Sequence, residues 1–323
     1  MTYFTRWAVG LLLAGAVLML GGCISVPFNR QEPLRYVELA GSGQPVVYML
    51  RIDGVISSDS SREGLVNPVV APSTVERVRM ELERLETDHI RPAALLLRIN
   101  SPGGTVTASD IIYHELSEYK RKTGVPVVAL VLDMAASGGY YVAMASDSIV
   151  AHPTGVVGSV GVIVPAVNIF QLLDKFGIKD TSVTSGPFKS LYTPTKPVQP
   201  EHQKVIQALV DDMYRQFVGV VADGRKGRLK QPVEKLADGR VFSAREALRL
   251  GLVDKVGYFE DGLQEVRRLT GLSEFRLVTL ERKPREDDTS TRYMRRDGAS
   301  PMAGLLFSPA SSMSPFYYLW WPN

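Results

Sequence analysis

The feature that most constrains the fold is a series of short apolar runs separated by segments with helical spacing. The runs are VVYMLRI at 46–52, AALLLRI at 93–99 and VPVVALVL at 125–132. Ser73, three residues before Glu76, predicts a capping box that opens one intervening helix, and apolar residues at 111–119 keep helical spacing in the next. Apolar strands that alternate with helices predict a buried, mostly parallel sheet, so the expected fold class is α/β.

The same alternation continues into the second half of the chain. GVIVP at 161–165 and SVT at 182–184 predict strands, and NIFQLLDKFGI at 168–178 predicts an amphipathic helix between them. A long helix is expected from Glu201, with an apolar stripe made of Val205, Leu209, Met213, Phe217 and Val220. Further on, Ser243 and Glu246 predict another capping box, and Gly251 predicts the end of that helix.

Composition narrows the class of protein. The 323 residues are 45% hydrophobic and 22% charged, which is ordinary for a globular protein with one large α/β domain or two smaller ones. The formal net charge of +3 comes from nearly balanced acids and bases, without a basic stripe. Nucleic acid is therefore not expected as a partner.

The N-terminus has the layout of a secretory signal. Arg6 precedes the apolar run at 7–20, which is followed by two glycines and by Cys23, the single cysteine of the chain. The run is shorter than the roughly 20 residues of a membrane-spanning helix. LGGC resembles the bacterial lipoprotein cleavage box, and this resemblance implies that residues 1–22 are removed and that lipid is attached to Cys23 outside the cytoplasm. An uncleaved signal anchor is the alternative.

The rest of the chain divides into three expected parts. Residues 23–44 contain prolines and glycines without a clear period and are interpreted as a tether. Residues 45–281 form the expected folded domain, and residues 282–323 form a polar, then Pro/Ser/Met-rich tail that ends in FYYLWWPN. Three interpretations of this aromatic end stay open: a packed tail, an anchor at the membrane interface, and a segment that docks in an active-site groove.

Two loops at the ends of predicted strands carry the candidate chemistry. NSPGGTV follows the strand at 93–99 and MAASGGYY follows the strand at 125–132, which is where open α/β sheets bind ligands. Ser137 lies in the second loop between small residues, a setting that exposes a hydroxyl for attack. SPGG offers backbone N–H groups that no side chain shields, as an oxyanion site requires.

A nucleophilic serine needs a base, and the histidines are poor candidates. His89, His114, His152 and His202 fall in helix-end, helix-interior or turn contexts. Lys189 lies among apolar residues in TSGPFKSLY. It would serve if burial lowered its pKa from about 10.4 by about three units, which costs about 4 kcal/mol.

The segments RINSPGG, AASGGYY, GVVGSVGV and SGPFK, in this order, resemble the signal peptide peptidase A family of the single-domain type. The resemblance implies Ser137 as the nucleophile, Lys189 as the base 52 residues later (189 − 137), and Ser159 as a residue that orients the lysine. It also implies an oxyanion hole made by the N–H groups of Gly138 and Gly104, with Gly103 as the alternative to Gly104.

The resemblance extends to the fold and the substrate. It implies a superhelix of repeated βαβ units with C-terminal helices, as in crotonases and caseinolytic protease subunits, assembled into a homo-oligomeric ring. The implied activity is cleavage of remnant signal peptides or other unfolded hydrophobic peptides at the membrane, on the periplasmic or external side, without metal or cofactor. A crotonase-like acyl-transforming enzyme and a catalytically silent lipoprotein scaffold are the alternatives.

Overall fold

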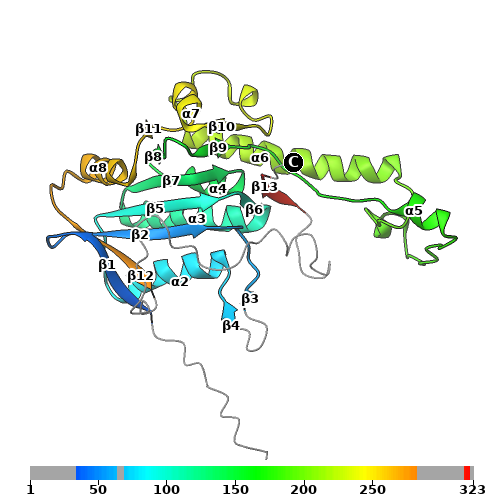
Figure 1. Cartoon of the computed structure of the whole chain (residues 1–323), viewed down its shortest axis with the longest axis horizontal. Helices are drawn as coiled ribbons and strands as arrows, with labels where there is room; N and C mark the ends of the chain where they lie inside the picture. The colour runs from blue at the N-terminus through cyan, green and yellow to red at the C-terminus, as the bar shows by residue number, and fades with distance from the viewer. Residues whose placement is uncertain (1–33, 64–68, 282–315, 321–323) are drawn as a thin grey trace, which may run out of the picture.

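A computed structural model describes residues 34–63, 69–281 and 316–320, and one nine-stranded sheet forms the centre of this part of the chain (Figure 1). The main order of strands is β1 (Arg35–Gly41), β12 (Arg276–Glu281), β2 (Val46–Asp53), β5 (Ala94–Ser101), β7 (Val127–Ala136), β8 (Ser148–Ala151) and β11 (Lys255–Val256). All neighbours on this path are parallel except the antiparallel pair of β1 and β12. The predicted α/β class with a mostly parallel sheet is confirmed.

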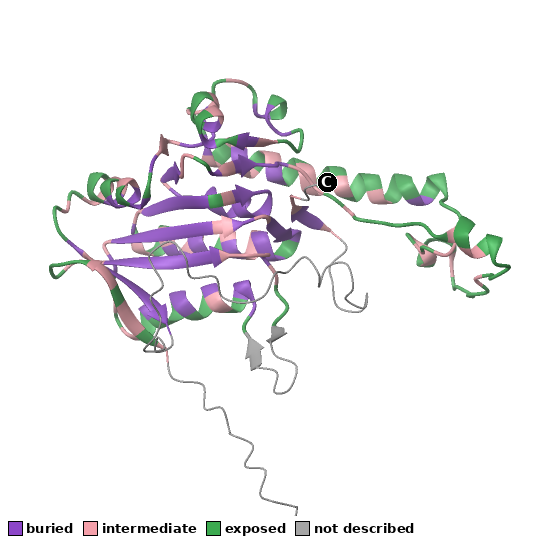
Figure 2. Cartoon of the chain, in the orientation of Figure 1, coloured by how far each residue is buried: buried purple, intermediate pink, exposed green. Residues whose placement is uncertain are grey.

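Both faces of the sheet are covered, which explains why its strands are apolar without alternation. The helices α2 (Thr74–Thr87), α3 (Val106–Thr123) and α4 (Gly138–Ala143) share the larger core, and α8 (Phe259–Thr270) lies in the second core. In β2, Tyr48 and Leu50 enter the larger core, whereas Val47 and Met49 enter the second. Figure 2 shows the resulting buried centre of the sheet.

Two predicted helix starts can be compared with the structure. Ser73 accepts a hydrogen bond from the Glu76 N–H (3.1 Å), and the Glu76 carboxylate accepts one from the Ser73 N–H (2.8 Å), so this capping box is confirmed. At α7 (Ala244–Leu250) the Ser243 hydroxyl accepts from the Glu246 N–H, but the Glu246 carboxylate pairs with Arg249 instead of completing the box. The helix ends as predicted at Gly251, which has φ +80°.

The expected tether and tail both contribute strands, which corrects the predicted division of the chain. β1 lies inside the expected tether 23–44 and pairs with β12 at the end of the expected domain 45–281. β13 (Tyr317–Leu319) lies inside the expected tail 282–323 and pairs with β6 (Gly103–Thr105). Neither pairing has a local signature, because each joins segments far apart in sequence. Residues 1–22 and Cys23 lie outside the described residues.

Residues 164–209, called the arm here, project from the body of the molecule (Figure 1). The arm contains α5 (Phe170–Lys175), the short 3-10 helix η1 (Pro187–Ser190) and the first half of α6 (Pro200–Gly224). The strands predicted at 161–165 and 182–184 do not form: in the first segment only Ile163 pairs, through a single bridge to Tyr317 of β13, and residues 182–184 pair with no described strand. Side chains along the arm are mostly exposed (Figure 2).

Three smaller features complete the described fold. β9 (Val156–Gly158) pairs with β7, and β10 (Val241–Ser243) pairs with β9. β3 (Ser61–Glu63) and β4 (Val69–Ala71) form a separate antiparallel pair. Of the helices in the described ranges, none has both the length and the apolar character needed to cross a membrane.

Candidate active site

Ser137 occupies the sharp turn between β7 and α4. Its backbone has φ 51° and ψ −117°, a strained conformation for a residue with a side chain, and its N–H donates to the Gly158 carbonyl at 2.7 Å. The residue is 1% exposed, its hydroxyl does not cap α4, and no described residue makes a hydrogen bond with that hydroxyl. A strained strand-to-helix turn of this kind is typical of nucleophilic serines.

The three glycines expected at the oxyanion hole lie together beside this turn. A Cβ built on Gly138 would lie 3.1 Å from the Gly104 amide nitrogen, and one built on Gly103 would lie 2.7 Å from the Gly138 amide nitrogen. At Gly104 a Cβ would lie 1.8 Å from the carbonyl oxygen of Ile56. The close packing leaves room for backbone only, so two N–H groups can be held next to one small space.

Ser159 lies next to Ser137 through the backbone. Gly158, which accepts the Ser137 N–H, precedes Ser159, and Ser159 is 6% exposed with φ 53°. Its own N–H donates to the Arg240 carbonyl at 2.8 Å. The structure therefore brings Ser137, Ser159 and the three glycines into one region.

Lys189 is not part of this region. It lies in η1 on the arm, where it is exposed, and its side chain makes no hydrogen bond or ion pair with any described residue. The burial expected from the apolar TSGPFKSLY segment is absent, because Phe188 and Tyr192 are themselves exposed. A neutral lysine would have to be buried by a surface outside this segment.

The histidines also stay away from Ser137. His89 and His114 are exposed, and His152 makes a hydrogen bond with the Thr154 hydroxyl at 2.8 Å. His202 lies in the first turn of α6 and is 7% exposed, with its ring 5.5 Å from that of Phe188. It lines a cavity of the arm to which Ser137 does not contribute.

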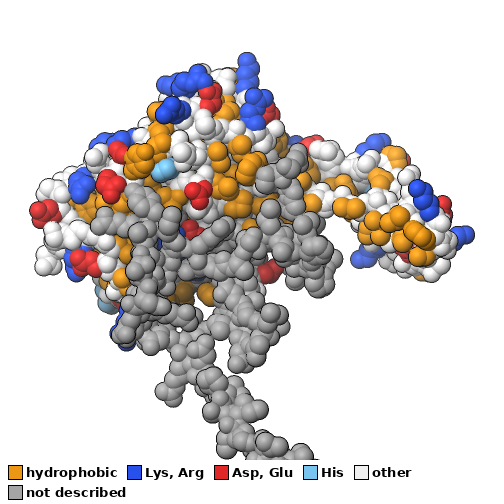
Figure 3. Space-filling view, in the orientation of Figure 1, with side chains coloured by type: hydrophobic (Ala, Val, Ile, Leu, Met, Phe, Trp, Pro, Cys, Tyr) orange, Lys and Arg blue, Asp and Glu red, His pale blue; other side chains and the backbone are white. Residues whose placement is uncertain are grey.

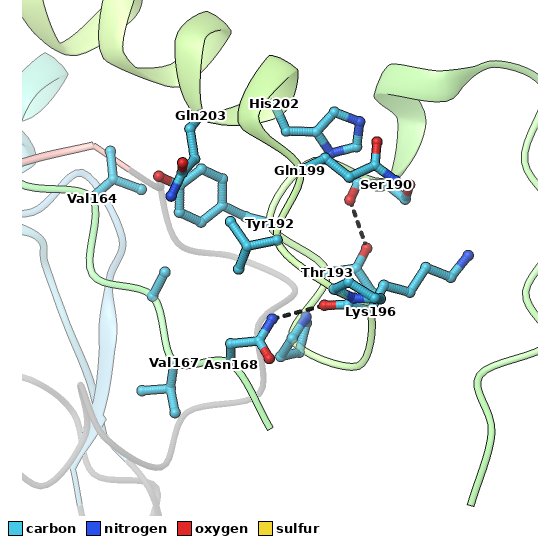
Figure 4. Close-up of a pocket in the computed structure, with 14 residues that line it drawn as sticks. Val164, Val167, Asn168, Ser190, Tyr192, Thr193, Lys196, Gln199, His202 and Gln203 are labelled. Carbon is cyan, nitrogen blue, oxygen red and sulfur yellow. Dashed lines mark hydrogen bonds between the residues drawn. The ribbon is translucent and has the colours of Figure 1, made fainter. Parts of the chain in front are cut away.

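The arm contains a cavity of about 340 Å³ at the start of α6 (Figure 4). Val164 and Val167 line one side, and Tyr192 and Lys196 line another, with the Lys196 carbonyl accepting from Asn168 Nδ2 at 2.8 Å. Neither Ser137 nor Lys189 lines this cavity. It is therefore separate from the candidate active site.

The end of the chain lies beside the Ser137 turn. β13 lies antiparallel to β6, with Tyr318 opposite Gly104, and on its other edge Tyr317 exchanges two hydrogen bonds of 3.0 Å with Ile163. The Trp320 N–H donates to the Pro102 carbonyl at 2.9 Å. The described residues 316–320 of the aromatic end therefore pack against the body, beside the candidate nucleophile.

The Tyr318 side chain enters a pocket that the sequence did not reveal. The pocket contains Tyr141, directly after the nucleophile loop, and Phe217 on α6, with ring centroids 5.1 and 4.6 Å from that of Tyr318. The sequence signalled Tyr141 only as part of AASGGYY and Phe217 only as part of an apolar helical stripe. No local pattern indicates that these rings meet a residue near the C-terminus.

The profile of Peptidase family S49 matches residues 119–273, and the Clp protease profile matches residues 62–154. A Synechocystis sp. protein assigned as the protease slr0021 is 41% identical over 207 residues, which cover 64% of this chain and 73% of that protein. An Enterococcus faecium protein assigned as a signal peptide peptidase SppA is 33% identical over 238 residues, covering 74% of this chain and 67% of that protein.

Two further matches cover very different shares of the matched protein. Protease 4 of Salmonella typhi is 35% identical over 191 residues, which are 59% of this chain and 30% of that protein. Among solved structures, a mutant of the 1510-N membrane-bound stomatin-specific protease aligns with a TM-score of 0.40 at 17% identity, over 70% of this chain and 86% of that chain. A structural likeness of this size adds nothing to the sequence matches.

Proposed function

Because the chain belongs to peptidase family S49, we propose that it is a serine-lysine endopeptidase in which Ser137 is the nucleophile and Lys189 is the general base. The observation that supports this assignment is the strained turn at Ser137 beside the amide groups of Gly104 and Gly138. Backbone amides at this position would stabilise the oxyanion that forms when Ser137 attacks a peptide carbonyl.

The proposed reaction has two steps. In the first, the neutral amine of Lys189 takes the hydroxyl proton as Ser137 Oγ bonds to the carbonyl carbon, and the C–N bond then breaks as Lys189 returns the proton to the leaving amine. In the second, Lys189 takes a proton from water, which hydrolyses the acyl-enzyme and restores the Ser137 hydroxyl. The Ser159 hydroxyl orients the lysine amine between steps.

Lys189 reaches Ser137 from a second copy of the chain in this proposal. Ser137 is buried in the body, whereas Lys189 is exposed on a projecting arm whose Val183 is 97% exposed. The apolar stripe of α6 is also exposed on the arm, at Val205 and Leu209. An arm that lies against the body of the next copy would cover these side chains and bury the lysine, and repetition of this contact generates a ring.

The proposed substrates are remnant signal peptides and other unfolded hydrophobic peptides. The Enterococcus faecium relative is assigned as a signal peptide peptidase, and β6 beside Ser137 pairs with an extended strand, β13. Lipid on Cys23 would hold the enzyme at a membrane, on the periplasmic or external side. A tethered enzyme shares its surface with peptides left in the membrane, which raises their effective concentration.

The test is hydrolysis of a synthetic signal peptide by the full-length protein in detergent, with Ser137→Ala and Lys189→Ala as variants. Each change is expected to lower kcat by about 10³-fold or more, because the nucleophile and base act as one unit. Lys179→Ala is the matched control, since Lys179 is another exposed lysine of the arm. Activity that survives Lys189→Ala would rule out this lysine as the base.

A further inference from the structure

Lys189 lies in the middle of a loop whose two ends are tied together. We call residues 183–194 the lysine loop. The Asp180 carboxylate, just before the loop, accepts a hydrogen bond from the Ser182 N–H at 2.8 Å and another from the hydroxyl of Thr195, just after the loop. Compact surface loops with closed ends are frequently functional, and this loop carries the proposed base.

The segment that follows the lysine loop is fixed to the rest of the arm. Lys196 Nζ donates to the Ser182 carbonyl at 3.2 Å, and the Lys196 carbonyl accepts from Asn168 Nδ2 at 2.8 Å. The Ile169 N–H donates to the Pro194 carbonyl at 2.8 Å. The base of the loop therefore has a defined position next to the start of α5.

The Asp180 carboxylate stays ionised near neutral pH. Hydrogen bonds from Ser182, followed by one from Thr195, lower the pKa of the Asp180 carboxyl to about 2. Both hydrogen bonds are therefore available throughout the neutral range. An activity loss measured there in a variant reports the missing side chain and not a change of charge on Asp180.

The middle of the lysine loop contacts α6 through a pair of rings. Within the described chain, the backbone hydrogen bonds of η1 stay inside the loop, for example from the Lys189 N–H to the Gly186 carbonyl at 3.2 Å. The ring of Phe188, directly before the lysine, lies 5.5 Å from that of His202 and is tilted by 45°. Among residues 164–209, all of which the structure describes, His202 alone is buried. This ring contact holds the turn that carries the base against α6.

His202 acts here through the packing of its ring. Its Nε2 atom is buried and has no hydrogen-bond partner among the described residues, and a buried polar atom without a partner lowers stability. His202 and Ser190, the last residue of η1, line the same cavity of the arm (Figure 4). Phenylalanine has a ring of similar size without the nitrogen, so His202→Phe should keep the support that His202→Ala removes.

We propose that Asp180 and His202 are positioning residues for the general base, Lys189. Asp180 closes the lysine loop at its base, and His202 supports its middle. The inference rests on the proposed peptidase function, in which Lys189 enters the site of the next copy. A loop held at its ends and at its middle presents the amine in one place, and a displacement of about 1 Å at a reacting group lowers the rate by roughly 10²-fold.

The first test measures kcat and KM for a synthetic signal peptide with the full-length protein in detergent, with assembly checked by sedimentation. Asp180→Ala and His202→Ala are each expected to lower kcat about 10-fold to 100-fold and to change KM less than about 2-fold, because the base acts on the bound substrate. Thr195→Val, which removes the hydroxyl bound to Asp180, should also lower kcat. Thr195→Ser and His202→Phe should keep a rate near that of wild type. Gln203→Ala, at an exposed position of the same helical turn, is the matched control.

The second test follows the lysine loop without catalysis. Trypsin cuts after lysine, and in a Ser137→Ala background the rate of the cut after Lys189 reports local opening of the loop. In Asp180→Ala and His202→Ala this cut is expected to be about 10-fold faster, relative to the cut after Lys226, which is exposed at the other end of α6. His202→Phe should leave the ratio of the two cuts unchanged.

The outcomes separate the inference from the proposed function. Wild-type kcat in Asp180→Ala and His202→Ala, with Lys189→Ala inactive, would overturn the positioning roles and leave the peptidase assignment standing. Full activity of Lys189→Ala would overturn the assignment of the base, and the inference with it. A lower kcat without faster cutting after Lys189 would show that the loop is not held by these side chains. A loss in His202→Phe as large as in His202→Ala would exclude ring packing as the role of His202.

Discussion

At the scale of single residues, the clearest prediction concerns Gly138. In Gly138→Ala the new Cβ would lie 2.3 Å from Ser109 Oγ, which itself donates to the Thr105 carbonyl at 2.9 Å. Either Ser109 or the turn that holds the Gly138 amide must shift. We expect peptidase kcat to fall by about 10²-fold or more, the usual effect of losing one oxyanion donor. Steady-state hydrolysis of one peptide by both forms measures this.

The control and a rescue make the prediction specific. Gly219→Ala on α6 meets no atom within 4 Å, so it should keep the wild-type rate and stabilise the helix by about 0.5 to 1 kcal/mol. In Ser109→Ala combined with Gly138→Ala the clashing oxygen is gone, and part of the lost rate should return, since coupled neighbours are not additive. A wild-type rate in Gly138→Ala alone would show that this amide is not an oxyanion donor.

Glu81 gives a prediction about pH. Its side chain is buried beneath the sheet, where it accepts from the Tyr48 hydroxyl at 2.8 Å and lies 3.7 Å from Arg77 Nη1. Burial raises the pKa of Glu81 above its ordinary value of 4.5, against the smaller lowering by Arg77. The folded state therefore holds this proton more tightly than the unfolded state, so the contribution to stability is present below pH 4.5 and is lost as pH rises through the folded pKa.

Glu81→Gln removes this titration. The free energy of unfolding of Glu81→Gln, relative to wild type, should rise as pH increases above 4.5, as measured by urea unfolding at a series of pH values. Glu83→Gln, on the exposed side of the same helix, is the reference. A relative stability that falls with pH would mean that the pKa of Glu81 is lowered by folding.

At the scale of elements, the C-terminal end of α6 is held by a buried arginine. Arg225 ends this helix and is 1% exposed; its guanidinium donates to both carboxylate oxygens of Asp254, at 2.8 and 3.0 Å, and to the Gly251 carbonyl at 2.9 Å. Arg225→Ala leaves Asp254 without this partner and should lower the free energy of unfolding by about 3 to 5 kcal/mol. Chemical denaturation measures the loss.

The matched control lies on the same helix. Arg215 pairs with Asp212 at 3.0 Å, but both side chains are more than half exposed, so Arg215→Ala should cost less than about 1 kcal/mol. Arg225→Lys should also be destabilising, because an ammonium cannot make the two parallel bonds of a guanidinium. Equal effects of Arg225→Ala and Arg215→Ala would show that the buried fork does not anchor α6.

The elements also show what could be predicted from the sequence. β2, β5 and β7 were predictable because each contains an apolar run covered on both faces, and α2 because its capping box is local. β1 and β13 were missed because their pairings join segments far apart in the chain. The strand predicted at 182–184 does not form for the opposite reason. Its residues have the alternating pattern, but no described strand pairs with them, and Val183 is 97% exposed.

The sequence also predicted one part of the candidate site and missed another. The motif order placed Ser137 and the three glycines together, because strand ends of a parallel sheet meet at one edge. It did not indicate that Lys189 would be exposed on an arm or that Tyr318 would lie beside these glycines. Both depend on surfaces that no local pattern encodes, either another copy of the chain or its distant end.

At the scale of the whole molecule, the arm exposes apolar side chains that no other part of the described chain covers. Figure 3 shows hydrophobic side chains gathered at its far end, where Leu172, Phe176 and Ile178 are each more than half exposed. Exposed apolar patches of this kind mark interaction surfaces. If the arm lies against the body of a neighbouring copy, Ser137 and Lys189 of one active site come from different chains.

That arrangement predicts complementation between two inactive variants. Ser137→Ala retains Lys189, and Lys189→Ala retains Ser137, so a site formed between the two kinds of chain can hold both intact residues. When the variants are co-expressed in equal amounts and assemble at random, roughly one site in four is complete, and about a quarter of the wild-type peptidase rate should return. Each variant alone should stay inactive.

The control is co-expression of Lys189→Ala with the double variant Ser137→Ala, Lys189→Ala, which offers no intact lysine and should recover nothing. Val183→Asp in the Ser137→Ala partner adds a charge to the exposed arm and should reduce the recovered rate if the arm is covered on assembly. Two inactive variants that stay inactive together, while sedimentation shows mixed oligomers, would place both residues of the dyad in one chain. The arm would then have to fold back onto its own body to bring Lys189 to Ser137, and Val183→Asp would act on that movement instead of on assembly.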